Sequence, residues 1–238
     1  MDFTKPHPLL ATPGKKLLPV IHVLDFEQTM RNVDVAFENG ADGVFLINHN
    51  FDGEHLLDIH AQIRRERPDG FIGLNLLDRS ATQAFEAVKD NDSVSALWVD
   101  DSGVDEGGYS QAANSLYDEM VKSDWRGAYF ASIAFKHQRP VTALDLVTAL
   151  AVDVCHALVT SGEATGSAPP QEKLRTIQQA LDGLKPLANA SGTNLDNVSV
   201  LGPHAEIFMV ATGINQDDDF YNLNPARVRI MADLLHKM

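Results

Sequence analysis

The sequence predicts a single closed (β/α)8 barrel, the TIM-barrel fold, on two observations. Short apolar, strand-like runs alternate with longer segments of helical periodicity from residue 17 to the C-terminus. The chain has 238 residues, which suits eight such pairs and leaves no second domain over. The competing architecture, an open doubly wound sheet, usually has a Gly-rich turn after its first strand, and no such turn follows residues 17–23. We therefore expect an N-terminal extension over residues 1–16 and the barrel over residues 17–238.

The four strands of the first half are expected at residues 17–23, 43–49, 71–77 and 96–99. The helix after the first strand should carry an apolar face and end at Asn39-Gly40, a typical helix C-terminus. Asp52 and Ser80 are the expected N-caps of the next two helices. A Gly-rich loop follows the fourth strand, and the fourth helix is expected near residues 116–125.

The second half repeats the pattern, with strands expected at residues 128–135, 157–160, 186–190 and 207–210. A helix over about residues 142–153 follows the first of these strands, and the next helix opens at Pro169-Pro170. The seventh helix is short, over residues 195–201. The last helix should be capped by Asn224, with Pro225 at its first position.

Composition and charge exclude several classes of partner. Acidic residues outnumber basic ones by 33 to 19, a formal net charge of −14, and no basic run is dense enough to bind nucleic acid or an anionic membrane. No stretch approaches the roughly 20 apolar residues of a membrane span, so membrane insertion is not expected. The single Cys155 lies in an apolar stretch and has no disulfide partner. We expect it to be a buried thiol in a reducing compartment, the cytoplasm.

Candidate catalytic residues follow from the fold, because the active site of such barrels lies at the C-terminal ends of the strands. The polar side chains selected there are His22, Asn75, Asp100 and Lys136. The Lys136 ammonium can hold a phosphate or act as a base if desolvated; the alternative is an ion pair with Asp100 or Asp101. These two carboxylates suit acid/base chemistry or a hard metal ion. Adjacent carboxylates alone do not indicate a metal, so no metal and no cofactor are predicted.

Three loops complete the predicted site. Two Gly-containing loops follow the last two strands, where this fold often binds phosphate through free N–H groups and a helix N-terminus; the expected phosphate ligands are Ser191, Gly192, Thr193, Thr212 and Gly213. Alternatively, these glycines only serve tight turns. The loop over residues 160–170 suggests a flexible flap over the mouth, with Ser161, Gly162, Glu163 and Thr165 meeting the substrate.

A family resemblance covers residues 70–238. It is carried by Phe135-Lys136-His137, the run from Ala157 to Pro169, Ser191 to Val198 and Asn224 to Val228, with Gly73 to Leu77 at the third strand. These motifs resemble the BtpA/SgcQ family, which is regarded as a member of the ribulose-phosphate-binding barrels. The first half departs from that family: Val23-Leu24-Asp25 replaces its His- and Pro-rich loop, and Asn48-His49-Asn50 replaces its Glu-Asn pair.

Two functions from different classes follow. The first is an enzyme of the lyase, isomerase or transferase class that binds and transforms a sugar phosphate or phosphoribosyl compound and also binds inorganic phosphate. The second is a non-catalytic assembly or stability factor for a partner complex, since the resemblance includes a member associated with photosystem I accumulation. The apolar residues Val147, Leu150 and Val154 lead us to expect a homo-oligomer.

Overall fold

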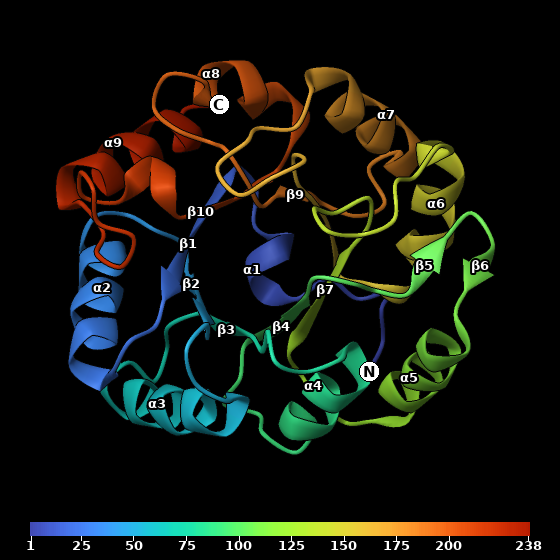
Figure 1. The fold of residues 1–238 in the computed structure, drawn as a ribbon, viewed down its shortest axis with the longest axis horizontal. Helices are drawn as coiled ribbons and strands as arrows, with labels where there is room; N and C mark the ends of the chain where they lie inside the picture. Colours follow the sequence, from blue (N-terminus) through green and yellow to red (C-terminus); the bar gives the residue numbers. More distant parts are fainter.

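The computed structural model describes residues 1–238 as a closed barrel of parallel strands inside a ring of helices (Figure 1). The predicted (β/α)8 fold is confirmed. Around the barrel the strands run in the order β1-β10-β9-β8-β7-β4-β3-β2. Their bounds are β1 Lys16–His22, β2 Val44–Ile47, β3 Ile72–Asn75, β4 Ala96–Val99, β7 Ala128–Ser132, β8 Ala157–Thr160, β9 Leu187–Asn189 and β10 Ile207–Val210.

Several helices begin at a residue whose polar side chain satisfies free N–H groups of the first turn. Asp52, Ser80 and Asn224 each accept from the first turn of the helix they precede, as predicted. The outer helices are α2 Phe26–Glu38, α3 Gly53–Glu66, α4 Ala81–Val88, α5 Gln111–Lys122, α6 Leu144–Ala151, α7 Gln171–Leu181, α8 Val198–Leu201 and α9 Pro225–His236. Short 3-10 turns lie at η1 Val152–Val154, η2 Gly202–His204 and η3 Thr212–Ile214.

Two apolar cores explain why the strands are continuous hydrophobic runs. Fifty buried residues pack between strands and helices, and 16 fill the inside of the barrel. Inside, Phe45 meets Trp98 and Phe130 edge to face, with ring centroids 5.8 and 5.1 Å apart. A strand with both faces buried needs apolar side chains at successive positions, so alternation is lost.

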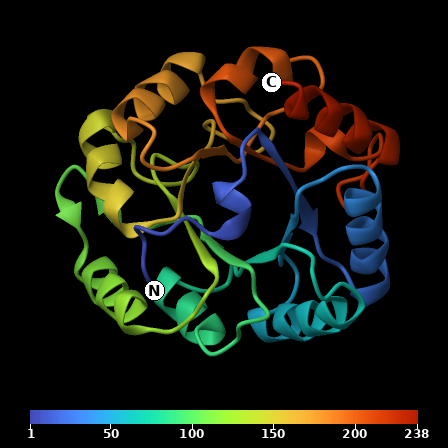
Figure 2. The same cartoon turned by 180° about the vertical axis from the view of Figure 1, so that it is seen from behind.

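The N-terminal segment lies across the end of the barrel where the strands begin. Its short helix α1 (Pro8–Ala11) sits in the centre of the ring in both views (Figures 1 and 2), and Leu9 and Leu10 pack against the inner core. Phe3 is buried, with its ring 5.2 Å from that of His156. A ligand therefore has access to the barrel interior from the carboxyl ends of the strands.

One boundary is corrected. The fourth helix is α5, which starts five residues before the expected 116; the Gly-rich loop before it forms a small antiparallel hairpin of β5 (Val104–Asp105) and β6 (Gly108–Tyr109). Of the three apolar residues behind the expected homo-oligomer, Val147 is fully buried, and Leu150 and Val154 are partly buried and pack against the core. The homo-oligomer itself stays a prediction. None of the helices is long and apolar enough to cross a bilayer.

Candidate functional site

A cavity of about 230 Å³ opens at the carboxyl ends of the strands. It brings together most of the residues selected from the sequence, namely His22, Asp100, Lys136, Thr165, Ser191, Gly192, Thr193 and Thr212. The barrel interior supplies an apolar floor of Val20, Ile47, Trp98 and Met209. Charged and apolar groups therefore share one small space.

Asp100 and Lys136 are the charged groups of this cavity. The Asn75 amide donates to Asp100 Oδ1 at 2.9 Å, so Asn75 orients the carboxyl while staying behind the cavity wall. Burial raises the pKa of Asp100, while Asn75 and the Lys136 charge oppose that shift. Lys136 Nζ forms no salt bridge; it lies 5.5 Å from the Phe135 ring centroid and 3.5 Å from Thr165 Oγ1. The alternative expectation, a structural ion pair with Asp100 or Asp101, is not formed.

Two imidazoles lie beside this pair. His22 Nδ1 is 2.7 Å from His49 Nε2, a direct hydrogen bond in which one ring donates and the other accepts. Burial, with the neighbouring His49 and Lys136 charges, lowers the pKa of His22 to about 3. Burial and Lys136 lower the pKa of His49 as well, against the Asp100 charge. Both rings are therefore neutral at neutral pH, a state in which they can accept and pass on a proton.

A second cavity, of about 390 Å³, opens beside the first. The two share Gly166, Gly192, Thr193 and Thr212 in their walls and therefore lie side by side. The backbone N–H groups of Gly192 and Thr193 donate to no acceptor in the chain. We call the group formed by Gly192, Thr193, Gly213 and Arg227 the anion cradle.

Arg227 is the member of the anion cradle that the sequence reasoning missed. Asn224 and Pro225 start α9, which places Arg227 in its first turn and its guanidinium in the cavity wall. Arg227 donates to the Asn215 carbonyl and to Asp217 Oδ1, each at 2.5 Å. These two bonds leave its remaining N–H groups for an anion. The sequence signal that could have found Arg227 is the predicted N-cap Asn224, which places Arg227 in the first turn of the last helix.

The glycines of the two loops allow a close backbone approach. A Cβ on Gly213 would lie 2.0 Å from the Thr193 carbonyl oxygen, and one on Gly192 would lie 2.0 Å from the Ala168 nitrogen. Gly192 also has φ +66°, which disfavours a side chain. The two glycines therefore allow the loops after β8, β9 and β10 to pack backbone against backbone, a role that a tight turn alone does not need.

The loop between β8 and α7 is fastened to the cradle. Ser191 Oγ donates to the Ser167 carbonyl and accepts from the Gly162 N–H, both at 2.7 Å. Its hydroxyl is therefore engaged in holding the loop. Ser161 is buried and its Oγ accepts from the Lys136 N–H at 2.8 Å. Glu163 is exposed, so within this loop only Thr165, among the four residues selected there, lines the main cavity.

Lys173 connects the segment after β7 to the loop after β8. Its ammonium, on α7, donates to the Ser161 carbonyl at 2.6 Å and to the carbonyl of Ala134. Burial lowers the pKa of Lys173 to about 8, which the Glu163 charge partly opposes. Ala134 has φ +45°, a left-handed conformation that is strained for a residue with a side chain. The bond from Lys173 thus holds the strained start of the segment that carries Lys136.

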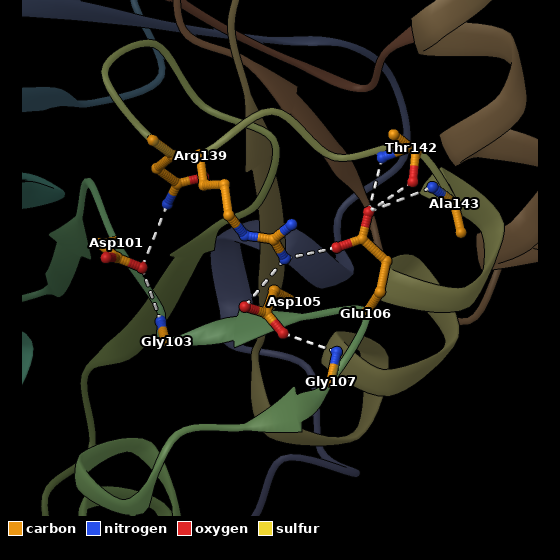
Figure 3. A network of polar contacts seen from close by, with 9 residues as sticks. Asp101, Gly103, Asp105, Glu106, Gly107, Arg139, Thr142 and Ala143 are labelled. Carbon is orange, nitrogen blue, oxygen red and sulfur yellow. Dashed lines mark hydrogen bonds and ion pairs between the residues drawn. The ribbon is translucent and has the colours of Figure 1, made fainter.

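A polar network holds the C-terminal end of the segment between β7 and α6 (Figure 3). Glu106, in the hairpin after β4, accepts from the Thr142 and Ala143 N–H groups, which lie directly before α6. Arg139 pairs with Glu106 at 2.6 Å and with Asp105 at 3.0 Å. These contacts tie the hairpin to the segment between β7 and α6.

Gln138 connects this braced segment to the acidic side of the cavity. Its Nε2 donates to the Asp100 carbonyl at 2.8 Å, and its Oε1 accepts from the Phe135 N–H at 2.8 Å. The Gln138 side chain therefore links the backbone of Asp100 to that of Phe135, the residue before Lys136. No group of three or more His, Cys, Asp or Glu side chains is arranged to hold a metal ion.

The sequence is similar to one family and to an archaeal protein. The model of the BtpA family matches residues 69–237. Uncharacterized protein MJ1115 of Methanocaldococcus jannaschii is 25% identical over 179 residues, which cover 70% of this chain and 66% of that protein. The match therefore spans just under two thirds of that relative's length.

Several solved structures share the fold. (S)-3-O-geranylgeranylglyceryl phosphate synthase from Thermoplasma acidophilum, solved with its substrate sn-glycerol-1-phosphate, superposes with a TM-score of 0.64 at 11% identity over 94% of both chains. Orotidine 5'-monophosphate decarboxylase from M. jannaschii, solved with the inhibitor BMP, has a TM-score of 0.65 at 13% identity over 94% of this chain and 99% of that one. A native KDPGal structure gives 0.60 at 13% identity, covering 100% and 96%. At these identities the likeness shows the fold.

Proposed function

Because the chain belongs to the BtpA family and folds as a (β/α)8 barrel, we propose that it binds and transforms a small phosphorylated metabolite. The phosphate lies in the anion cradle of Gly192, Thr193, Gly213 and Arg227. The reacting part of the molecule lies in the adjoining cavity, between Lys136 and Asp100. Sugar phosphates and phosphoribosyl compounds are the substrate class, and a lyase, isomerase or transferase is the reaction class.

One observation carries this proposal. Arg227 of α9 lines the same cavity as Gly192 and Thr193 of the loop after β9, whose backbone N–H groups have no acceptor in the chain, and as Gly213 of the loop after β10. Free N–H groups and a guanidinium are strong donors to a phosphate, and in this fold these loops are a frequent phosphate site. Two of the structural neighbours support the substrate class, since one was solved with sn-glycerol-1-phosphate and the other is named for orotidine 5'-monophosphate.

The chemistry follows from the protonation of the neighbouring groups. With its pKa raised by burial, Asp100 is the group best suited to exchange a proton with a substrate carbon or oxygen. The Lys136 ammonium stabilises negative charge that develops on an adjacent oxygen. The neutral His22 and His49 pair supplies a second route for a proton. A proton transfer next to a carbonyl or hydroxyl is a step that lyases and isomerases of phosphorylated sugars have in common.

Phosphate binding tests the proposal directly. We expect inorganic phosphate and ribose 5-phosphate to bind the wild-type protein in a calorimetric titration, and Arg227→Gln to weaken both by roughly 10- to 100-fold, since a hydrogen bond to a charged group contributes about 1.5–3 kcal/mol. Arg229→Gln is the matched control, because Arg229 lies two residues away and donates to Asn39 outside the site. Equal affinity of the wild type and Arg227→Gln would contradict the proposed cradle.

The assembly-factor alternative predicts an apolar docking face outside the mouth and a dispensable Lys136. The most exposed large apolar side chains outside the mouth lie on or directly after five different helices: Val121, Leu146, Leu184, Val200, Ile230 and Met238. No specific structural feature therefore favours this alternative over the phosphate site.

A further inference from the structure

The main cavity contains an aromatic ring that neither the anion cradle nor the acid/base groups require. Phe220 lies between β10 and α9, lines the cavity and keeps 38% of its surface exposed. Its ring stacks on His22, with centroids 4.0 Å apart and planes 24° apart. Leu77, at 39% exposure, lines the same cavity from the loop after β3. Exposed apolar side chains at the mouth of a binding cavity point to an apolar part of the ligand.

Phe220 is held in this place by its neighbours. Asn215 Nδ2 donates to the Phe220 carbonyl at 2.8 Å. The next carbonyl, that of Tyr221, accepts from Gln28 and Asn32 of α2 at 2.7 and 3.0 Å, and both of these amides are buried. A loop fastened to a helix by buried side chains cannot easily fold its aromatic ring back into the core. The ring is therefore presented to the cavity.

The mixture of groups in the cavity limits what can fill it. A polyol phosphate would place hydroxyl groups against Ile47, Trp98 and Met209, which offer almost no hydrogen bonds, and burying such hydroxyls is unfavourable. A hydrocarbon tail would leave the Asp100 carboxyl and the Lys136 ammonium desolvated without partners. A flat ring with polar atoms at its edge satisfies both, because its face contacts the apolar side chains and its edge reaches the charged ones.

We infer that the ligand is a phosphomonoester whose other half is a flat ring with polar atoms at its edge, stacked beside Phe220, and that a bare sugar phosphate is not the preferred ligand. This inference rests on the proposed phosphate site. The ring lies over the floor of Ile47, Trp98 and Met209. Its edge atoms face Lys136 and Asp100, and its phosphate occupies the anion cradle.

Two probes that share a phosphate and a ribose, but differ in the ring, test this inference. We expect uridine 5'-monophosphate to bind about tenfold more tightly than ribose 5-phosphate, equivalent to about 1.4 kcal/mol, since base–aromatic stacking is of this order. Phe220→Ala should remove that tenfold difference and leave the affinity for ribose 5-phosphate unchanged. Phe220→Trp, which keeps an aromatic face, should retain it. Phe51→Ala is the matched control, because Phe51 is a partly buried aromatic outside the cavity lining.

The outcomes separate this inference from the proposed function. If the wild type binds the two probes equally, or if Phe220→Ala weakens both to the same extent, the ring is not recognised and the inference is wrong, while phosphate binding stands. If neither probe nor inorganic phosphate binds the wild type, the phosphate site itself is wrong and the inference falls with it.

Discussion

Gly213 lies against Thr193 so closely that a Cβ on Gly213 would be 2.0 Å from the Thr193 carbonyl oxygen. This contact joins the loop after β10 to the loop after β9 and brings the Thr193 N–H into the same cavity wall as Arg227. Because Gly213 is not in the left-handed region, its need for glycine comes from this close approach rather than from its own backbone conformation. The anion cradle therefore depends on the distance between two backbone segments.

Gly213→Ala should separate the two loops. We expect a loss of about 1–3 kcal/mol in the free energy of unfolding, since the added methyl group overpacks a fixed backbone contact, together with a loss of roughly tenfold in phosphate affinity. Urea denaturation and calorimetry measure the two effects. Gly183→Ala is the control: Gly183 has φ +72° and open space around it, so it should lose stability and keep its phosphate affinity. Unchanged phosphate binding in Gly213→Ala would show that the loop contact does not build the cradle.

His60 should make the protein less stable in acid. This side chain of α3 is fully buried, and neither ring nitrogen makes a well-formed hydrogen bond. Burial, aided by the charge of Arg64, lowers the pKa of His60 from 6.5 to about 4. The unfolded chain therefore binds a proton more readily than the folded one between these values, and stability falls as the pH is lowered through that window. At about pH 5 the loss from this one group is about 2 kcal/mol.

The variant His60→Leu isolates that contribution. It keeps an apolar side chain of similar size in the core, so the stability at neutral pH should change little. Near pH 5 it should be about 2 kcal/mol more stable than the wild type in urea denaturation. His55→Leu, on the exposed face of the same helix, should follow the wild-type pH profile. Parallel profiles for all three proteins would mean that His60 has the same pKa in the folded and the unfolded chain.

Lys173→Met should loosen the backbone that carries Lys136. The change removes the donor to the Ser161 and Ala134 carbonyls, which leaves Ser161 without this partner and Ala134 with only the long bond from Thr160 Oγ1 at 3.4 Å. We expect faster hydrogen exchange, measured by mass spectrometry, in peptides that cover residues 134–138 and 161–167. Lys122→Met, at the end of α5, is the control. Unaltered exchange in both segments would show that Lys173 does not position them.

The alternation of strand-like and helix-like segments in the sequence was sufficient to predict the fold. Strands buried on both faces and helices with one apolar face give different periodicities, and Asp52, Ser80 and Asn224 marked helix starts by their own chemistry. The β5–β6 hairpin could not be read in the same way, because its strands are two residues long and show no period. The apolar residues Val147 and Leu150 suggested a subunit contact, whereas they pack against the protein's own core.

The residues of the candidate site that lie at strand ends could be predicted from the sequence, whereas those on α9 and in the loop before it could not. His22, Asp100 and Lys136 meet in one cavity because parallel strands bring their carboxyl ends together. Arg227 and Phe220 enter from α9 and from the loop before it, and their direction depends on tertiary contacts that no local pattern encodes. The roles of the selected residues in catalysis and phosphate binding stay predictions.

A crystal structure of the protein soaked in inorganic phosphate tests the anion cradle itself. We expect a tetrahedral density peak in the cavity between the β9 and β10 loops, with oxygen atoms about 2.7–3.1 Å from the Gly192 and Thr193 nitrogens and from the Arg227 guanidinium. The same peak should be absent from crystals of Arg227→Gln soaked in parallel. An empty cradle in the wild type at a saturating phosphate concentration, or a phosphate bound elsewhere in the mouth, would show that these residues do not form a phosphate site.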